Sequence, residues 1–302
     1  MVTDLSVDFC GLTFKNPITT ASGTFGSGME YKEFFDLSLL GAVTTKGVSI
    51  EPWEGNEVPR VAETPSGMLN AIGLQNPGVK VFRERDLPFL EGFDTRIIVN
   101  VCGHSIEEYC RAAEALSETA ADILEINISC PNVAEGGLSF GTDPAQVLRI
   151  TRAVKDISKK PVFMKLSPNV TSIAEIAKAA EAGGADGLSL INTLTGMKID
   201  VRKRSFFLAN RTGGLSGPAI HPVAVRMVYE AARAVSLPII GMGGVRTAED
   251  ALELILAGAS MVAVGTANFH DPLAAPRIVK GLAEFMEEEG IASVKSLIGA
   301  VE

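Results

Sequence analysis

The chain has 302 residues, of which 46% are hydrophobic and 21% are charged, and its formal net charge is −9. This composition excludes a disordered chain, and a negative charge without any basic run argues against a nucleic-acid-binding surface. No signal peptide and no run of about 18 apolar residues is present, so we expect a cytoplasmic protein without a membrane-spanning helix. The cysteines are scattered and fit neither a disulfide framework nor a metal site.

The first hundred residues are irregular. Residues 7–9 and 12–14 predict a short hairpin around Gly11, and residues 17–20 predict a strand. Small residues at 21–28 would allow a ligand to approach the backbone closely. We expect a helix over 30–38 and a second strand over 41–47. Residues 48–92 contain five prolines and are too long for a passive loop, so this segment should carry small elements or a function.

From residue 96 onward, short apolar runs alternate with amphipathic segments. The predicted strands are 96–101, 123–128, 161–166, 187–192, 238–241 and 261–264. Helix starts are marked by Ser105, Asp143, Ser172 and Thr247, residue types that cap helix amino termini. Further helices are expected over 222–235 and 272–289, and a long loop from 193 to about 220.

Eight such strands, apolar on both faces and alternating with helices, indicate a parallel sheet. At this chain length the pattern favours a closed (β/α)8 TIM barrel that is preceded by an amino-terminal hairpin. Inserted loops are expected at the carboxyl face of the barrel. We expect residues 1–302 to form a single domain. An open doubly wound sheet is the alternative, because sequence does not show closure.

In a barrel of this kind the active site lies where the strands end. Gly243 and Gly244 follow the seventh predicted strand, and Gly265 and Thr266 follow the eighth. Backbone N–H groups of glycines at adjacent strand ends form a phosphate-binding cradle. Ordinary glycine turns are the alternative. A phosphate site alone does not distinguish a phosphorylated substrate from flavin mononucleotide (FMN).

Two lysines and several amides follow other strands. Lys46 and Lys165 end apolar runs, and at a barrel mouth they would serve an anionic ligand or stabilise charge on a reduced flavin. The amides are Asn70, Asn100, Asn127, Asn132 and Asn192. Each carboxamide both donates and accepts hydrogen bonds, as recognition of a pyrimidine imide requires. Solvated lysines and capping asparagines are the structural alternatives.

Cys130 stands at a predicted strand tip, before Pro131 and close to Asn127 and Asn132. We interpret it as a catalytic thiol, against the alternative of a buried structural cysteine. Its thiolate must be generated by the fold or by the substrate complex, because no charged side chain adjoins it in sequence and a free thiol has a pKa of about 8.5. The other cysteines, and all three histidines, are interpreted as structural.

These motifs together resemble the dihydroorotate dehydrogenases, flavin enzymes of pyrimidine biosynthesis. The resemblance runs over nearly the whole chain. Its landmarks are residues 21–23, 45–47, 69–78, 127–132, 165, 191–193, 216–218, 243–244 and 265–266. A cysteine base rather than a serine is typical of the soluble class of the family, and residues 68–78 resemble its NAD-linked subclass, class 1B.

The resemblance implies a role for each matching residue. Cys130 would remove the C5 proton of (S)-dihydroorotate while hydride passes from C6 to FMN, and Lys165 would favour the reduced anionic ring. The implied FMN contacts are Ala21, Ser22, Gly23, Thr45, Lys46, Asn100, Asn127, Lys165, Ile191, Gly217, Gly243, Gly244, Gly265 and Thr266. The implied substrate contacts are Lys46, Asn70, Ile72, Gly73, Leu74, Asn127, Asn132, Asn192 and Thr193.

The resemblance also implies a partner. Electrons would pass to NAD+ through a second subunit with FAD and a [2Fe–2S] cluster, in a heterotetramer built on a homodimer of this chain. The sequence has no G-x-G-x-x-G after a strand and no cluster-binding cysteine spacing, which fits that division. A fumarate-dependent class 1A enzyme and a flavin-free phosphate-sugar lyase or isomerase barrel are the alternatives. Residues 131–142 are expected to form a lid.

Overall fold

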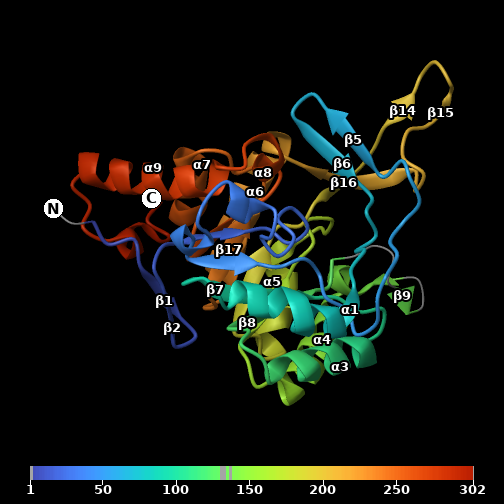
Figure 1. Cartoon of the computed structure of the whole chain (residues 1–302), viewed down its shortest axis with the longest axis horizontal. Helices are drawn as coiled ribbons and strands as arrows, with labels where there is room; N and C mark the ends of the chain where they lie inside the picture. Colours follow the sequence, from blue (N-terminus) through green and yellow to red (C-terminus); the bar gives the residue numbers. More distant parts are fainter. Residues whose placement is uncertain (1–2, 130–133, 136–137, 302) are drawn as a thin grey trace.

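The computed structural model describes residues 3–129, 134–135 and 138–301. Its centre is an eight-stranded ring of parallel strands with helices outside it (Figure 1). In order round the ring, the strands are β3 (Ile18–Thr20), β18 (Met261–Val264), β17 (Ile239–Met242), β12 (Gly187–Leu190), β11 (Val162–Lys165), β8 (Ile123–Asn127), β7 (Arg96–Val101) and β4 (Ala42–Thr44). Their residues are buried almost throughout, which explains why the runs are apolar without alternation.

The ring closes between β3 and β4, where threonine side chains supplement the backbone. The Gly41 N–H donates to the Ile18 carbonyl at 3.0 Å. The Thr44 N–H donates to Thr20 Oγ1 at 3.0 Å, and that hydroxyl donates to the Thr44 carbonyl at 3.1 Å. The expected (β/α)8 barrel is therefore confirmed, and the open sheet is not the architecture of this chain.

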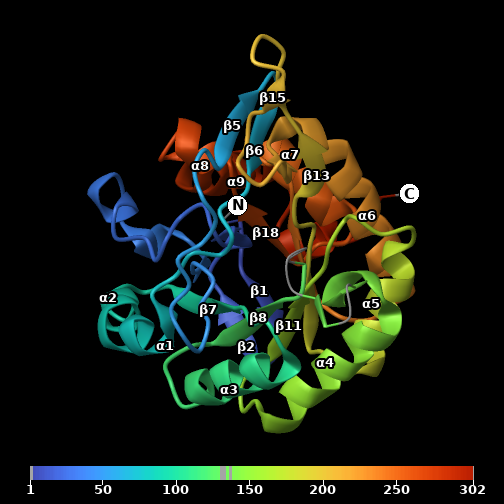
Figure 2. The same ribbon diagram turned by 90° about the vertical axis from the view of Figure 1, so that its right-hand side faces the viewer.

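Long helices cover the outside of the ring (Figure 2). They are α3 (Ile106–Ser117), α4 (Pro144–Ile157), α5 (Ile173–Ala182), α6 (His221–Ala234), α7 (Ala248–Leu256) and α9 (Ala274–Glu288). Four of them begin as the sequence predicts, with side-chain caps from Ser105, Asp143, Ser172 and Thr247. Each cap accepts a hydrogen bond from a backbone N–H of the first turn that has no partner within the helix.

Short elements connect these units. They are η1 (Tyr31–Glu33), η2 (Leu37–Leu39), α1 (Gly78–Val81), η3 (Phe82–Asp86), α2 (Leu87–Leu90), β9 (Ala134–Glu135), β10 (Leu138–Ser139), η4 (Phe140–Thr142), η5 (Pro218–Ile220), α8 (Ala267–His270) and η6 (Val294–Leu297). The expected continuous helix over 30–38 is wrong. Asp36 adopts an extended conformation there and its carboxylate accepts the Ser38 N–H, so a second short turn begins instead.

The amino-terminal hairpin lies against the amino end of the barrel. It consists of β1 (Val7–Phe9) and β2 (Leu12–Phe14), as predicted. The ring of Phe9 stacks on Phe14 with centroids 4.4 Å apart and lies 5.7 Å from Phe163 of β11. The hairpin therefore covers the end of the barrel that carries no candidate site residues.

Two segments far apart in sequence form a second sheet beyond the carboxyl ends of the barrel strands. We call it the roof sheet; its strand order is β13 (Leu194–Met197), β16 (Thr212–Ser216), β6 (Gly67–Asn70) and β5 (Val61–Thr64). Figure 1 shows β5, β6 and β16 together, with the small pair β14 (Ile199–Asp200) and β15 (Ser205–Phe206) at the tip. The expectation of a loop from 193 to about 220 is therefore wrong, because β13 and β16 of this segment pair with each other and β16 also pairs with residues 68–70.

Among the described residues, no helix is long and apolar enough to cross a membrane.

A close contact between neighbouring strands generates a prediction on stability. Gly187 of β12 lies opposite Phe163 of β11, and a Cβ at Gly187 would lie 2.2 Å from the aromatic ring. Overpacking a core costs about 1–3 kcal/mol, so we expect Gly187→Ala to lower the free energy of unfolding by this amount in urea denaturation. Gly92→Ala, at an exposed position, is the control. Equal stability of the two variants would contradict the packing argument.

Candidate active site

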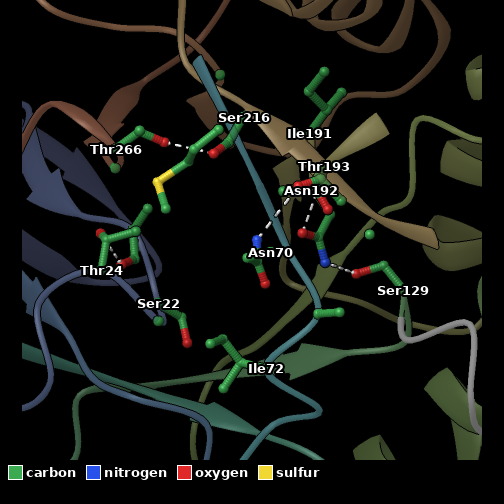
Figure 3. Close-up of a pocket in the computed structure, with 18 of the residues that line it drawn as sticks. Ser22, Thr24, Asn70, Ile72, Ser129, Ile191, Asn192, Thr193, Ser216 and Thr266 are labelled. Atoms are coloured by element: carbon green, nitrogen blue, oxygen red, sulfur yellow. Dashed lines mark hydrogen bonds between the residues drawn. The ribbon is translucent and has the colours of Figure 1, made fainter. Parts of the chain in front are cut away.

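A cavity of about 400 Å³ lies between the carboxyl ends of the barrel strands and the roof sheet. Strand ends supply its floor and walls, and Asn70, Gly213 and Gly214 of the roof sheet face it from the other side. Figure 3 shows Ser22, Asn70, Ser129, Asn192 and Thr266 around this space, although they come from five separate segments. The volume lies in the range of small-molecule and cofactor sites, about 300–1,000 Å³.

Most of the candidate residues from the sequence line this one cavity. They are Ala21, Ser22, Gly23, Lys46, Asn70, Ile72, Gly73, Leu74, Asn127, Lys165, Ile191, Asn192, Thr193, Gly217, Gly243, Gly244, Gly265 and Thr266. Thr45 and Asn100 do not line it; both are fully buried behind its wall. Cys130 and Asn132 lie outside the described residues, as does part of the expected lid over 131–142.

One wall of the cavity is built from glycine backbone. Gly217, Gly243 and Gly244 have φ angles of 101°, 133° and 73°, which favour glycine. Helix α6 packs directly behind them, so that a Cβ at Gly244 would lie 2.7 Å from the Cβ of His221. Glycine turns after two adjacent strands identified Gly243 and Gly244 from the sequence, whereas Gly217 was implied by the family resemblance.

His221, interpreted from the sequence as structural, is the first residue of α6 and connects this wall to α7. Its Nδ1 lies 2.7 Å from the Gly243 carbonyl oxygen and its Nε2 lies 2.9 Å from Glu253 Oε2 of α7. On the same side of the cavity, Thr266 Oγ1 donates to Ser216 Oγ at 2.7 Å (Figure 3). The wall is therefore held in place by side chains as well as by backbone geometry.

The amides at the barrel mouth form a connected network. Ser129 Oγ donates to Asn127 Oδ1 at 2.7 Å, and Asn192 Nδ2 donates to the same serine hydroxyl. Asn192 Oδ1 accepts the Thr193 N–H at 2.8 Å. Ser129 was not a sequence candidate, although its position between Asn127 and Cys130 was a usable signal. The network connects Asn127 to Asn192 through the Ser129 hydroxyl.

Two ammonium groups reach the cavity in different electrostatic settings. Lys46 is partly buried, and none of the described carboxylates lies within ion-pair distance of it. Burial lowers its pKa below the ordinary value of 10.5, and the nearby Arg60 acts in the same direction against the opposing effect of Cys102. Lys165 is 3.5 Å from Glu125 Oε1, and both side chains are almost fully buried.

Glu125 is the main residue that sequence reasoning missed. Its Oε1 accepts a 2.6 Å hydrogen bond from Asn100 Nδ2 as well as facing Lys165. Among the described residues, Asn100 Oδ1 and Glu125 Oε2 have no hydrogen-bond partner although both atoms are buried. A carboxylate inside the otherwise apolar run 123–126 was the available signal, since a charge in a strand buried on both faces needs a partner.

Comparison with known proteins agrees with this arrangement. Residues 4–286 match the family described as dihydroorotate dehydrogenase. Three curated relatives are each described as "Dihydroorotate dehydrogenase B (NAD(+)), catalytic subunit". The chain is 64% identical over 297 residues to the protein of Lachnoclostridium phytofermentans, covering 98% of this chain and 99% of the relative. It is 58% identical over 298 residues to that of Alkaliphilus metalliredigens, covering 99% of each, and 56% identical over 301 residues to that of Geotalea uraniireducens, covering 99% and 98%.

The lowered pKa of Lys46 predicts how stability depends on pH. The unfolded chain binds more protons than the folded chain between the folded pKa and the ordinary value of 10.5, so stability rises with pH across that window. We expect Lys46→Met to increase the free energy of unfolding at neutral pH, with a gain that shrinks towards about pH 10. Urea denaturation of the chain without added ligand measures this. Lys280→Met, at an exposed lysine, is the control, and a loss of stability in Lys46→Met at neutral pH would contradict the prediction.

Proposed function

The chain belongs to the dihydroorotate dehydrogenase family and is an oxidoreductase of dihydroorotate in pyrimidine biosynthesis; we propose that it works as an FMN-binding, NAD-linked catalytic subunit. The observation that carries the proposal is the cavity at the barrel mouth, where a glycine wall, two lysines and a network of amides converge. We propose further that residues 1–302 act as one domain in this role.

Three features of the cavity fit FMN. The phosphate would be held by Gly217, Gly243, Gly244, Gly265 and Thr266, since glycines leave the backbone of this wall uncovered by side chains. Lys165 presents a buried positive charge to the opposite part of the cavity. Ala21, Ser22, Gly23 and Ile191 would border the remainder of the cofactor.

The third feature is the Asn100 side-chain oxygen behind Gly47, a residue that lines the cavity. A Cβ at Gly47 would lie 3.1 Å from Asn100 Oδ1, so this buried oxygen, which has no hydrogen-bond partner among the described residues, lies directly behind the cavity wall. The proposed effect of Asn100 on the cofactor would therefore be exerted across Gly47. Thr45 Oγ1 accepts the Asn100 N–H at 3.4 Å and donates to the Lys46 carbonyl at 3.0 Å, so Thr45 would act by positioning its neighbours.

Other residues are proposed to bind the substrate. The donors and acceptors of the dihydroorotate ring would pair with Asn70, Asn127, Asn192 and Thr193, and with Asn132, which is assigned from the family resemblance alone. Lys46 and the backbone of residues 72–74 would bind the carboxylate, because the Lys46 ammonium has no protein carboxylate of its own within the described part of the chain. An anionic ligand would then restore the pKa that burial lowers.

In the proposed reaction, the Cys130 thiolate takes the C5 proton and a hydride leaves C6, which creates the C5–C6 double bond of orotate. Bound FMN supplies the acceptor for that hydride. Lys165 would stabilise negative charge on the cofactor, and the amide network would orient the substrate ring. The role of Cys130 rests on its place in the sequence and on the family resemblance.

The partner is also part of the proposal. The relatives' names contain the words catalytic subunit and NAD(+). A second subunit with FAD and a [2Fe–2S] cluster would carry electrons from the catalytic subunit to NAD+. We propose a heterotetramer built on a homodimer of this chain, in the cytoplasm, where its scattered thiols would stay reduced.

Substitution of the glycine wall tests the cofactor site. In Gly244→Ala the new Cβ would collide with His221 at 2.7 Å and with the Gly217 carbonyl at 2.8 Å. We expect this variant to lose most of its bound FMN, measured as flavin absorbance per protein after gel filtration. Gly290→Ala has a comparable positive φ of 67° but open space around its Cβ, and it should retain FMN. Full FMN content in Gly244→Ala would contradict the proposal that the glycine wall binds the FMN phosphate.

Removal of the proposed base tests the reaction. We expect Cys130→Ala to keep its yellow colour but to be reduced by anaerobic dihydroorotate about 10²–10⁴-fold more slowly, the usual contribution of a general base. Stopped-flow absorbance of the flavin measures the rate. Cys130→Ser should be slow, with its pH profile displaced upward, because a hydroxyl is a weaker acid than a thiol.

Two outcomes of the same experiment would count against the proposal. Normal reduction of Cys130→Ala would show that another group is the base. Rapid reoxidation of the reduced wild-type chain by fumarate, without any partner subunit, would contradict the NAD-linked assignment.

A further inference from the structure

Glu125 is a buried carboxylate just outside the cavity. It lies in the middle of β8, its side chain is 1% exposed, and it is not among the residues that line the cavity. Its contacts are two residues that the proposed function places next to the cofactor, the Lys165 ammonium at 3.5 Å and the Asn100 amide at 2.6 Å. Glu125 therefore lies directly behind Lys165 and Asn100, two proposed cofactor contacts.

Stability of the barrel does not explain this carboxylate. Charge buried in a low-dielectric interior is costly, and a buried ion pair is often no more stable than an apolar pair of similar volume. Glu125 Oε2 adds to the cost, since it has no hydrogen-bond partner among the described residues. Asn100 could obtain an acceptor from a neutral amide at the same position. What a neutral residue would not supply is a negative charge next to Lys165.

The geometry of the pair leaves the lysine free to respond to a ligand. A separation of 3.5 Å exceeds the usual 2.7–3.2 Å of an N–H···O hydrogen bond. The ammonium is thus attracted to Glu125 but not held in a short bond, and it also borders the cavity. A second negative charge on the cavity side would share the same ammonium.

We propose that Glu125 is a positioning residue that keeps Lys165 at the cavity lining and offsets its charge, and would thereby lower the reduction potential of a bound flavin. This inference rests on the proposed function. A single uncompensated lysine would stabilise the reduced cofactor strongly, because electrostatic interactions are strong in a water-excluded site. Glu125 reduces that stabilisation, so that the reduced cofactor can still pass its electrons to an acceptor as weakly oxidising as NAD+. Charge near the ring is one of the means by which a protein tunes a flavin.

The test is the midpoint potential of the FMN-loaded chain, measured by equilibration with a reference dye. Glu125→Gln keeps the shape and the acceptor for Asn100 but removes the charge, so its potential should shift to more positive values. Lys165→Gln should shift to more negative values. The double variant Glu125→Gln/Lys165→Gln removes both charges and should return towards the wild type, as expected for two coupled charges.

A matched control separates this effect from loss of any buried carboxylate. Asp86 is 5% exposed and paired with Arg85 at 3.0 Å, but it does not line the cavity. Asp86→Asn should leave the potential at the wild-type value. Thermal unfolding of the FMN-free proteins gives a second readout, in which Glu125→Gln should melt lower than the double variant because it leaves Lys165 buried without a counter-charge.

The outcomes distinguish this inference from the proposed function. A wild-type chain that binds no FMN would overturn both. A wild type that is reduced by dihydroorotate, with an unchanged potential in Glu125→Gln, would overturn only the role of Glu125. If Glu125→Gln does not fold, the double variant decides the matter, because a potential equal to that of Lys165→Gln would show that Glu125 contributes no charge effect.

Discussion

The parallel pairing of β7, β8 and β11 is the constraint on which the site depends. This register places Asn100 beside Glu125 and Asn127 beside Lys165. In a strand, successive side chains point to opposite faces, so a shift of one residue would turn each of these groups to the other side. The apolar residues between them fix the register, since they must stay between the barrel and its helices. Hydrophobic packing thus determines where the polar chemistry lies.

The cavity combines parts with different physical character. Its floor consists of barrel strands, whose side chains are packed on all sides and whose charges are paired. Its glycine wall consists of backbone, held from behind by His221 and α6. Rigid backbone donors suit a group with fixed charge such as a phosphate, whereas Lys46, which lacks a described carboxylate partner, suits a ligand that brings its own negative charge.

Local sequence patterns predicted the barrel and most of the cavity lining, because strand runs, helix caps and glycine turns are all encoded within a few residues. The roof sheet was missed for the opposite reason. Its central pairing joins residues 68–70 to residues 214–216, and neither segment shows a partner locally. The burial of Asn100 was also unpredictable. The sequence places Asn100 on a strand, but it does not show that Gly47 lies between Asn100 and the cavity. Glu125 was missed because its partner, Lys165, is far away in the sequence and becomes a neighbour only when β8 and β11 pair.

The roof sheet has its own small group of buried apolar residues, Ala62, Leu69, Ala71 and Leu208, separate from the core of the barrel. A unit with few buried side chains opens at a lower free-energy cost than a barrel core, in the manner of a local unfolding unit. Opening of the roof sheet would therefore cost less free energy than opening of the barrel, although Leu194 and Leu215 also pack against the barrel core. A bulky cofactor would then enter a barrel that is already folded, and the barrel would not have to be assembled around it.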